Sequence, residues 1–352
     1  MKKYLEIYEK IKNDIINGVY GFNEKLPSKR TIAEDMKVSV VTVETAYDIL
    51  QSEGYIFSIE RSGYFVSYNT DFTYKTNTKS EERTEVFSIS KNNEYFPFST
   101  LASATRKILN SFGEALLEKS ANTGTEYLKK AIKNYLIRNR GISVEEEQII
   151  IGSGSEYLYG IITELLGHDK IYAIESPSYE QIEKVYVAKN VKIEKLPITS
   201  SGISSENLNK SVAQILHVTP YRSYPTLATA TVSKKKEYLS WAIKRDGFVI
   251  EDDYESEFSL TTKTTDTIFG SDKNAPVIFV NTFTKSICPA LRVGYMLIPK
   301  FLTGTFYQKL GFYSCTLPTL EQYLIAHILN DGSFERHVNK IRRLRRKQLT
   351  TT

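Results

Sequence analysis

The sequence predicts an α/β protein with a small helical N-terminal domain and a large domain built on a mostly parallel central sheet. Near the N-terminus, three segments with helical spacing of apolar residues precede two short alternating strands. From about residue 85 onward, apolar β-rich runs alternate with helical stretches, an order typical of parallel sheets covered by helices. The 352 residues are enough for two or three domains with cores of their own.

Residues 1–68 form the first predicted unit. Its first helix, in residues 4–18, places apolar side chains at helical spacing: Tyr4, Ile7, Tyr8, Ile11 and Ile15. A second helix follows Ser28, and a third runs from Ser39 to Gly54, because serine is a frequent N-cap and glycine a frequent C-cap. Two strands then flank an Arg61-Ser62-Gly63 turn. Three helices and a hairpin predict a winged helix-turn-helix.

Residues 69–84 are polar and have no period, which predicts a linker to a large domain over residues 85–352. Seven strand candidates follow, at residues 148–154, 170–177, 192–198, 214–220, 247–254, 275–283 and 292–299. Helical stretches such as 125–139 and 233–246 fall between several of them. This alternation predicts helices packed on a mostly parallel sheet.

Composition narrows the class of protein. No apolar run is long enough to span a membrane, and the N-terminus is too charged for a secretory signal, so we expect no membrane partner. The two cysteines, Cys288 and Cys315, make a disulfide framework improbable, so we expect a reducing, cytoplasmic setting. The net charge of +5 comes largely from residues 340–348, KIRRLRRKQ, so it does not by itself indicate DNA binding. No metal site is predicted.

The N-terminal unit offers a surface for double-stranded DNA. In a helix-turn-helix the second helix of the motif enters the major groove, N-terminal residues first, while preceding residues and the wing contact phosphates or the minor groove. The residues predicted to contact DNA are Lys29, Arg30, Ser39, Thr42, Thr45, Arg61 and Gly63. The same residues would also suit an ordinary small helical domain with a solvated hairpin.

The stretch KLPSKRTIAEDMKVSVVTVETAYDILQSEGYIFSIERSGYFV resembles the winged-helix domain of GntR-family bacterial regulators. This resemblance implies operator binding. The sequence departs from the family at Val40, where an arginine is frequent, and at Glu44, a position that is basic in some relatives. Acidic and basic residues of the unit roughly cancel, so we expect modest affinity unless two copies act together.

The stretch NTFTKSICPALRVGY places Lys285 among the hydroxyls of Thr282, Thr284 and Ser286, with Arg292 seven residues on. A lysine can condense with an aldehyde as a Schiff base, while hydroxyls and a guanidinium can hold a phosphate. Pyridoxal phosphate meets both demands, and it also needs a carboxylate for its ring nitrogen.

Other strand ends offer the remaining parts of such a site. Asp252, in VIEDDY, supplies a carboxylate, with Tyr254 close by for the ring oxygen. The segment GSGSEY, residues 152–157, offers backbone N–H groups to an anion, and Tyr179 offers a flat ring. Each pattern alone is also typical of an ordinary loop or turn. Together they favour one site, because ligands bind at the C-terminal ends of parallel strands.

The chain after the linker resembles the fold-type-I aminotransferase-like domain that MocR-type regulators join to a GntR head. The stretches that match include ESPSY, VIEDDYESEF, NTFTKSICPALRVGY and GSFERHVNKIRRLR. The resemblance implies that Lys285 is the Schiff-base lysine, that Asp252 binds the ring nitrogen, and that Tyr254 lies near the ring oxygen. It further implies that Tyr179 stacks on the ring and that the phosphate is held by Gly154, Ser155, Thr282, Thr284 and Arg292.

Three departures qualify the resemblance. Glu156 replaces a usual glutamine, and a carboxylate beside a phosphate is unfavourable unless it turns away. In PYRSYPTLATA, Tyr224 and Leu227 stand where the family has Phe or Asn and Gly. We also expect the usual C-terminal lobe, with its substrate-binding arginine, to be missing after RRLRRKQLTTT. Without that lobe, efficient transamination is not expected.

The sequence therefore favours a transcription regulator that binds operator DNA and senses pyridoxal phosphate, or an amine or amino-acid adduct of it, and the family resemblance implies that it acts as a homodimer. Two alternatives stay open. One is a pyridoxal-phosphate-dependent aminotransferase with an appended DNA-binding head. The other is a truncated DNA-binding remnant without an effector response.

Overall fold

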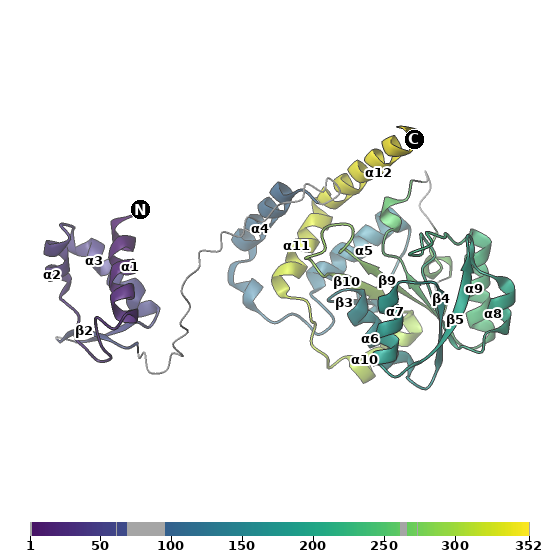
Figure 1. The fold of residues 1–352 in the computed structure, drawn as a ribbon, viewed down its shortest axis with the longest axis horizontal. Coiled ribbons are helices and arrows are strands. Elements are labelled where there is room, and N and C mark those ends of the chain that lie inside the picture. The colour runs from purple at the N-terminus through teal and green to yellow at the C-terminus, as the bar shows by residue number, and fades with distance from the viewer. Residues whose placement is uncertain (1, 61, 69–95, 261–265, 273, 352) are drawn as a thin grey trace. The chain divides into compact units, whose positions relative to one another are not determined.

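The computed structural model describes residues 2–60, 62–68, 96–260, 266–272 and 274–351 (Figure 1). It divides into two compact units, Met1–Ile89 and Ser90–Thr352. The predicted linker, residues 69–84, lies outside the described residues, as does Arg61.

The N-terminal unit has the predicted winged helix-turn-helix order. Its elements are α1 (Lys3–Ile16), α2 (Lys29–Asp35), α3 (Val40–Ser52), β1 (Ile56–Ile59) and β2 (Gly63–Val66). The two serine caps are both present: Ser28 accepts a hydrogen bond from the backbone N–H of Thr31, and Ser39 accepts one from Thr42. Strands β1 and β2 pair antiparallel. The apolar face of α1 packs against α3 in a core of its own.

In the described part of the large unit, eight strands form one sheet in the order β3-β10-β9-β8-β7-β4-β5-β6. Their bounds are β3 (Ile149–Gly152), β4 (Ile171–Ser176), β5 (Lys192–Thr199), β6 (Gly202–Ile203), β7 (Ile215–Val218), β8 (Phe248–Asp252), β9 (Val277–Thr282) and β10 (Gly294–Leu297). The pairs from β9 through β8, β7 and β4 to β5 are parallel. Strand β10 runs antiparallel to both its neighbours, and β6 runs antiparallel to β5. The predicted, mostly parallel sheet is confirmed.

Helices cover both faces of this sheet (Figure 1). They are α4 (Phe98–Phe112), α5 (Glu126–Arg140), α6 (Ser155–Leu166), α7 (Glu180–Ala188), α8 (Ser205–Lys210), α9 (Val232–Lys244), α10 (Thr303–Leu310), α11 (Thr319–Asn330) and α12 (Ser333–Thr351). Successive strand residues point to opposite faces. Accordingly, Ile149 and Ile151 join the core beneath α5 and α11, whereas Ile150 joins the core beneath α6, α7 and α10.

This topology fixes where a ligand site can form. Because β10 reverses direction between β3 and β9, the last residues of β3, β4, β8 and β9 share one edge of the sheet. Gly152, Ser176, Asp252 and Thr282 are those last residues. The four segments that the sequence predicts for the cofactor site therefore meet where these strands end.

Candidate functional site

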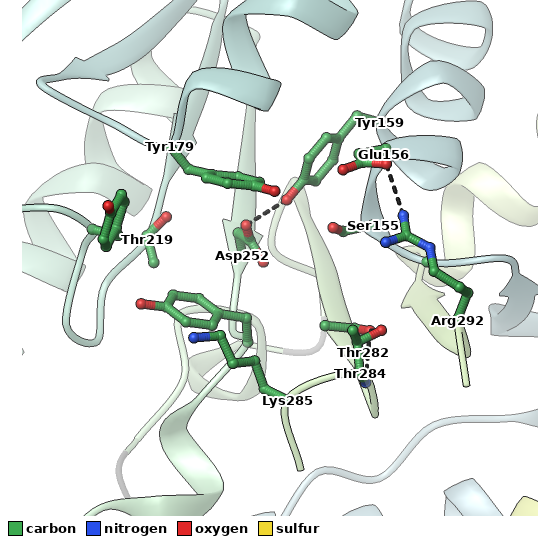
Figure 2. Close-up of a pocket in the computed structure, with 13 residues that line it drawn as sticks. Ser155, Glu156, Tyr159, Tyr179, Thr219, Asp252, Thr282, Thr284, Lys285 and Arg292 are labelled. Carbon is green, nitrogen blue, oxygen red and sulfur yellow. Dashed lines mark hydrogen bonds and ion pairs between the residues drawn. The ribbon is translucent and has the colours of Figure 1, made fainter. Parts of the chain in front are cut away.

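A pocket of about 310 Å³ opens at this edge of the sheet (Figure 2). All the residues that the sequence predicts for the cofactor line it: Gly154, Ser155, Tyr179, Asp252, Tyr254, Thr282, Thr284, Lys285 and Arg292. Four further residues also line it, namely Glu156, Tyr159, Thr219 and Tyr224. Segments separated by more than a hundred residues thus meet in one cavity.

Asp252 lies buried at the end of β8. Its Oδ2 accepts a hydrogen bond of 2.5 Å from the Tyr159 hydroxyl, while Oδ1 is buried without a hydrogen-bond partner among the described residues. Burial, and then the Asp252 carboxylate, raise the pKa of Tyr159 well above its ordinary value, so this phenol stays a neutral donor. Asp252 keeps one unsatisfied acceptor.

Beneath Asp252 lies a buried polar pair. The Tyr186 hydroxyl and His217 Nδ1 are 2.7 Å apart, and His217 Nε2 is 3.9 Å from Asp252 Oδ2. The His217 ring meets Tyr159 edge to face. Neither Tyr159 nor His217 was predicted from the sequence as part of the site. Tyr159 follows Ser155 by four residues in α6, and that spacing could have placed both on one helix face.

Lys285 follows β9 in a turn, and its side chain is exposed. Its Nζ lies 5.7 Å from the centre of the Tyr254 ring, within the range of a cation–π contact. Figure 2 shows Tyr179 and Lys285 on opposite sides of Asp252. The Tyr254 hydroxyl donates to the backbone carbonyl of Arg222 at 2.9 Å, and burial raises its pKa. The lysine is therefore reachable from solvent and lies beside an aromatic wall.

The threonines around the lysine shape its loop. The hydroxyls of Thr282 and Thr284 are 2.8 Å apart, and the backbone N–H of Thr284 donates to Thr282 Oγ1 at 3.2 Å. Thr282 also reaches the carbonyl of Val293, at 3.0 Å, which ties the turn to the segment before β10. Ser286, the third hydroxyl of this stretch, is buried and does not line the pocket.

The start of α6 forms the opposite end of the pocket. Gly154, at φ 91°, precedes the helix and offers no side-chain cap. A Cβ at this position would lie 3.3 Å from Arg292 Nη2, so glycine lets the guanidinium approach closely. Glu156 does not turn away from this end: its Oε2 accepts a hydrogen bond of 2.7 Å from Arg292 Nη2.

Leu227, at the position where the resemblance implies a glycine, lies in the loop after β7 with a backbone conformation that glycine favours. Leu227 adopts φ 59°, in the left-handed region that glycine favours, and its N–H donates to Ser223 at 2.6 Å. The loop keeps a glycine-like backbone with a leucine side chain that is half exposed. Tyr224, in the same loop, lines the pocket.

In the N-terminal unit, several residues predicted to contact DNA make hydrogen bonds or ion pairs within the protein. Ser39 caps α3, and the Thr45 hydroxyl donates to the carbonyl of Val41 at 3.0 Å. Gly63 adopts a positive φ of 119° at the start of β2. Lys29 Nζ lies 2.5 Å from Glu44 Oε1 and 5.5 Å from the centre of the Tyr64 ring. Arg30 is exposed, and Thr42 is half-buried. Thus an acidic residue of α3 holds the lysine that starts α2.

Both units of the chain are similar to known proteins. Residues 3–66 match the family described as bacterial regulatory proteins, gntR family. The HTH-type transcriptional regulator YdeL of Bacillus subtilis is 30% identical over 98% of this chain and 77% of its own length. The HTH-type pyridoxine biosynthesis transcriptional regulator PdxR of Corynebacterium glutamicum is 24% identical over 97% of this chain and 76% of its own. The "Probable rhizopine catabolism regulatory protein MocR" of Rhizobium meliloti is 28% identical over 96% and 74%.

The large unit resembles solved aminotransferases. Kynurenine aminotransferase of Pyrococcus horikoshii superposes with a TM-score of 0.64 at 22% identity, over 71% of this chain. LysN, the α-aminoadipate aminotransferase of Thermus thermophilus, gives 0.63 at 23% identity, over 72%. The chain spans 64% and 65% of the length of these two proteins. These likenesses establish the fold of the large unit.

The chain belongs to the gntR family of bacterial regulatory proteins, in the MocR-type group that joins a winged helix-turn-helix to an aminotransferase-like domain. It is a helix-turn-helix transcription regulator, and its N-terminal unit is a DNA-binding domain. Within the residues that the structure describes, no helix is long and apolar enough to cross a membrane.

Proposed function

We propose that the large domain binds pyridoxal phosphate in the pocket at the sheet edge and that cofactor binding, alone or with an amine or amino acid, regulates DNA binding by a homodimer. One observation carries this proposal. Residues from four separate segments, chosen for the amine, ring and phosphate contacts of the cofactor, line a single pocket. Such convergence of polar groups is typical of ligand sites at the ends of parallel strands.

The residues present fit the cofactor. Asp252 Oδ1 is a buried acceptor without a partner among the described residues, and a protonated ring nitrogen is the donor that would satisfy it. Gly154 leaves room at the start of α6, where backbone N–H groups and the helix dipole favour an anion. Bound there, the cofactor would supply an aldehyde that reacts with amines.

Each side chain would then have a distinct task. Lys285 presents its amine to the aldehyde, and Asp252 holds the proton at the ring nitrogen, oriented by its hydrogen bond from Tyr159. Tyr179 covers one face of the ring, while Tyr254, fixed by its bond to Arg222, borders the lysine. Thr282, Thr284 and Arg292, with the N–H groups of Gly154 and Ser155, bind the phosphate.

The test is the absorbance of bound cofactor. The full chain, mixed with pyridoxal phosphate and freed of excess by gel filtration, is expected to retain a visible band that Lys285→Ala lacks. Lys236→Ala, an exposed lysine of α9 away from the pocket, is the matched control and is expected to keep the band. Identical spectra from wild type and Lys285→Ala would reject this role for the lysine.

DNA binding by the N-terminal unit would use Lys29, Arg30, Ser39, Thr42, Thr45, Arg61 and Gly63. Selection from a randomised duplex library by the full chain, with and without pyridoxal phosphate, would reveal both the operator and its response to cofactor. A two-fold repeat in the selected DNA is expected from a dimer. An unchanged affinity with and without cofactor would favour a DNA-binding protein without an effector response.

A second candidate is an aminotransferase activity of the same pocket. It is favoured because the exposed Lys285 and the buried Asp252, the two groups that amine chemistry on this cofactor requires, line the same pocket. Steady transfer of amino groups from amino acids to a keto acid by the purified chain would establish it.

A further inference from the structure

The ion pair of Glu156 and Arg292 lies at the end of the pocket proposed to take the phosphate. The 2.7 Å contact joins Glu156 Oε2 to Arg292 Nη2, and both residues line the pocket. Figure 2 shows the Glu156 carboxylate near Ser155 with the guanidinium turned toward it. The guanidinium also lies close to Gly154. A carboxylate of the chain is therefore bound to the cation that an incoming phosphate needs.

Two features draw the Glu156 carboxylate to this place. Glu156 belongs to the first turn of α6, where the helix dipole favours negative charge, and Arg292 approaches from the segment before β10. The negative charge of Glu156 also acts on Tyr179 in the pocket wall. Partial burial raises the pKa of the Tyr179 hydroxyl, and the nearby Glu156 carboxylate raises it further. The carboxylate thus occupies the same electrostatic environment that would favour a bound anion.

We propose that Glu156 is an internal anion that competes with the phosphate group of pyridoxal phosphate for Arg292 and the start of α6. This inference rests on the proposed function of the pocket. A phosphate that enters must separate the ion pair and then remain beside a like charge. The side chain of Arg292 is 50% exposed and that of Glu156 is 36% exposed. Ion pairs that are exposed to this extent are weak enough to exchange partners.

The competition affects the phosphate and not the ring. Pyridoxal, which has the same aldehyde and ring but no phosphate, does not need Arg292. Glu156 therefore lowers the preference of the pocket for the phosphorylated form over the free form. Glutamine at this position keeps the size and hydrogen-bonding capacity of the side chain but removes the competing charge.

Equilibrium dialysis of the full chain against pyridoxal phosphate and, separately, pyridoxal tests this. Glu156→Gln is expected to bind pyridoxal phosphate roughly tenfold more tightly than wild type, which corresponds to about 1.4 kcal/mol. Its affinity for pyridoxal is expected to change less than about twofold, since no phosphate is involved. The gain is expected to shrink at high salt. In an Arg292→Gln background, the gain is expected to shrink as well, because no guanidinium is left to release.

Glu206→Gln is the matched control. It removes the same charge and breaks the ion pair with Lys210 on α8, outside the pocket, and we expect no change in affinity for either compound. Circular dichroism verifies that every variant is folded. Equal pyridoxal phosphate affinity in wild type and Glu156→Gln would overturn the inference and leave the proposed function intact. So would an equal gain for both compounds, or a gain that is undiminished without Arg292. If no folded variant binds either compound, the proposed function fails with it.

Discussion

Lys29 of α2 and Glu44 of α3 form an ion pair, with 2.5 Å between Nζ and Oε1, in the DNA-binding domain. Lys29 also lies over the ring of Tyr64 in β2. One side chain thus connects two helices and the wing. Because a cation that is paired inside the protein neutralises a DNA phosphate less effectively, this contact bears directly on affinity for DNA.

Replacing Glu44 is therefore expected to strengthen DNA binding. Glu44→Gln releases Lys29 for a phosphate, so we expect severalfold higher affinity at low salt and a slope of log K against log salt that is steeper by roughly 0.9. Binding of a duplex at several salt concentrations measures both. Glu34→Gln, which removes an exposed charge of α2, serves as the control. An unchanged slope for Glu44→Gln would show that Lys29 does not reach DNA.

Replacing Asp252 is expected to weaken cofactor binding while the fold persists. In Asp252→Asn the amide oxygen can still accept the Tyr159 hydrogen bond, but the charge that would hold a proton on the ring nitrogen is gone. We expect at least a tenfold loss in affinity for pyridoxal phosphate, about 1.4 kcal/mol. Dialysis measures the affinity, and urea unfolding shows whether the fold remains. Wild-type affinity in this variant would contradict the assigned role of Asp252.

Replacing Leu227 by glycine is expected to stabilise the large domain. A non-glycine residue in the left-handed region costs roughly 1–2 kcal/mol, whereas glycine adds about 0.4–1 kcal/mol of unfolded-state entropy, so the net gain should be near 0.5–1 kcal/mol. Urea unfolding measures it. Leu227→Ala keeps the positive φ and is expected to give no gain. Equal stability of the glycine and alanine variants would mean that the backbone is not strained.

Stability is expected to fall as the pH rises from about 5 to 8. Burial raises the pKa of Glu175, Glu251 and Glu257 to about 7. Between about pH 4.5 and pH 7 the folded chain therefore keeps protons on these carboxyls that the unfolded chain has released. The free energy of unfolding falls with rising pH in this range, and it levels off once the folded carboxyls have also ionised, above about pH 7. Each group accounts for roughly 1–3 kcal/mol across that window.

Unfolding by urea at closely spaced pH values measures this dependence. Glu257→Gln, whose amide oxygen can still accept from Asn281, is expected to reduce the slope. A curve for this variant that parallels wild type would show that Glu257 is already ionised in the folded chain at pH 5.

The sequence predicted seven of the eight described strands of the sheet, because buried strands are continuous apolar runs bounded by turn residues; the two-residue strand β6 was not predicted. It also predicted nine of the thirteen residues that line the pocket, since Asp252 and Thr282 end strands and ligand sites gather at such ends. Strand order was not predictable. That β10 lies between β3 and β9 depends on pairing across more than a hundred residues, which local patterns do not encode.

The contacts inside the site were less accessible to sequence reasoning. His217 occupies a strand position where a buried polar residue is indistinguishable from core until Tyr186 is placed beside it. The direction of Glu156 depends on Arg292, which is distant in sequence. Arg61, at the wing tip, lies outside the described residues, so its predicted DNA contact stays a prediction.

Helix α6 lines the pocket with Ser155 and Glu156 in its first turn and with Tyr159 one turn later. Tyr159 donates to Asp252, while Glu156 binds Arg292. Because the helix moves as one unit, the contact of Glu156 with Arg292 and the contact of Tyr159 with Asp252 are mechanically coupled. We therefore expect a ligand that changes either contact to affect the other, and also α7 and α10, which share a core with α6.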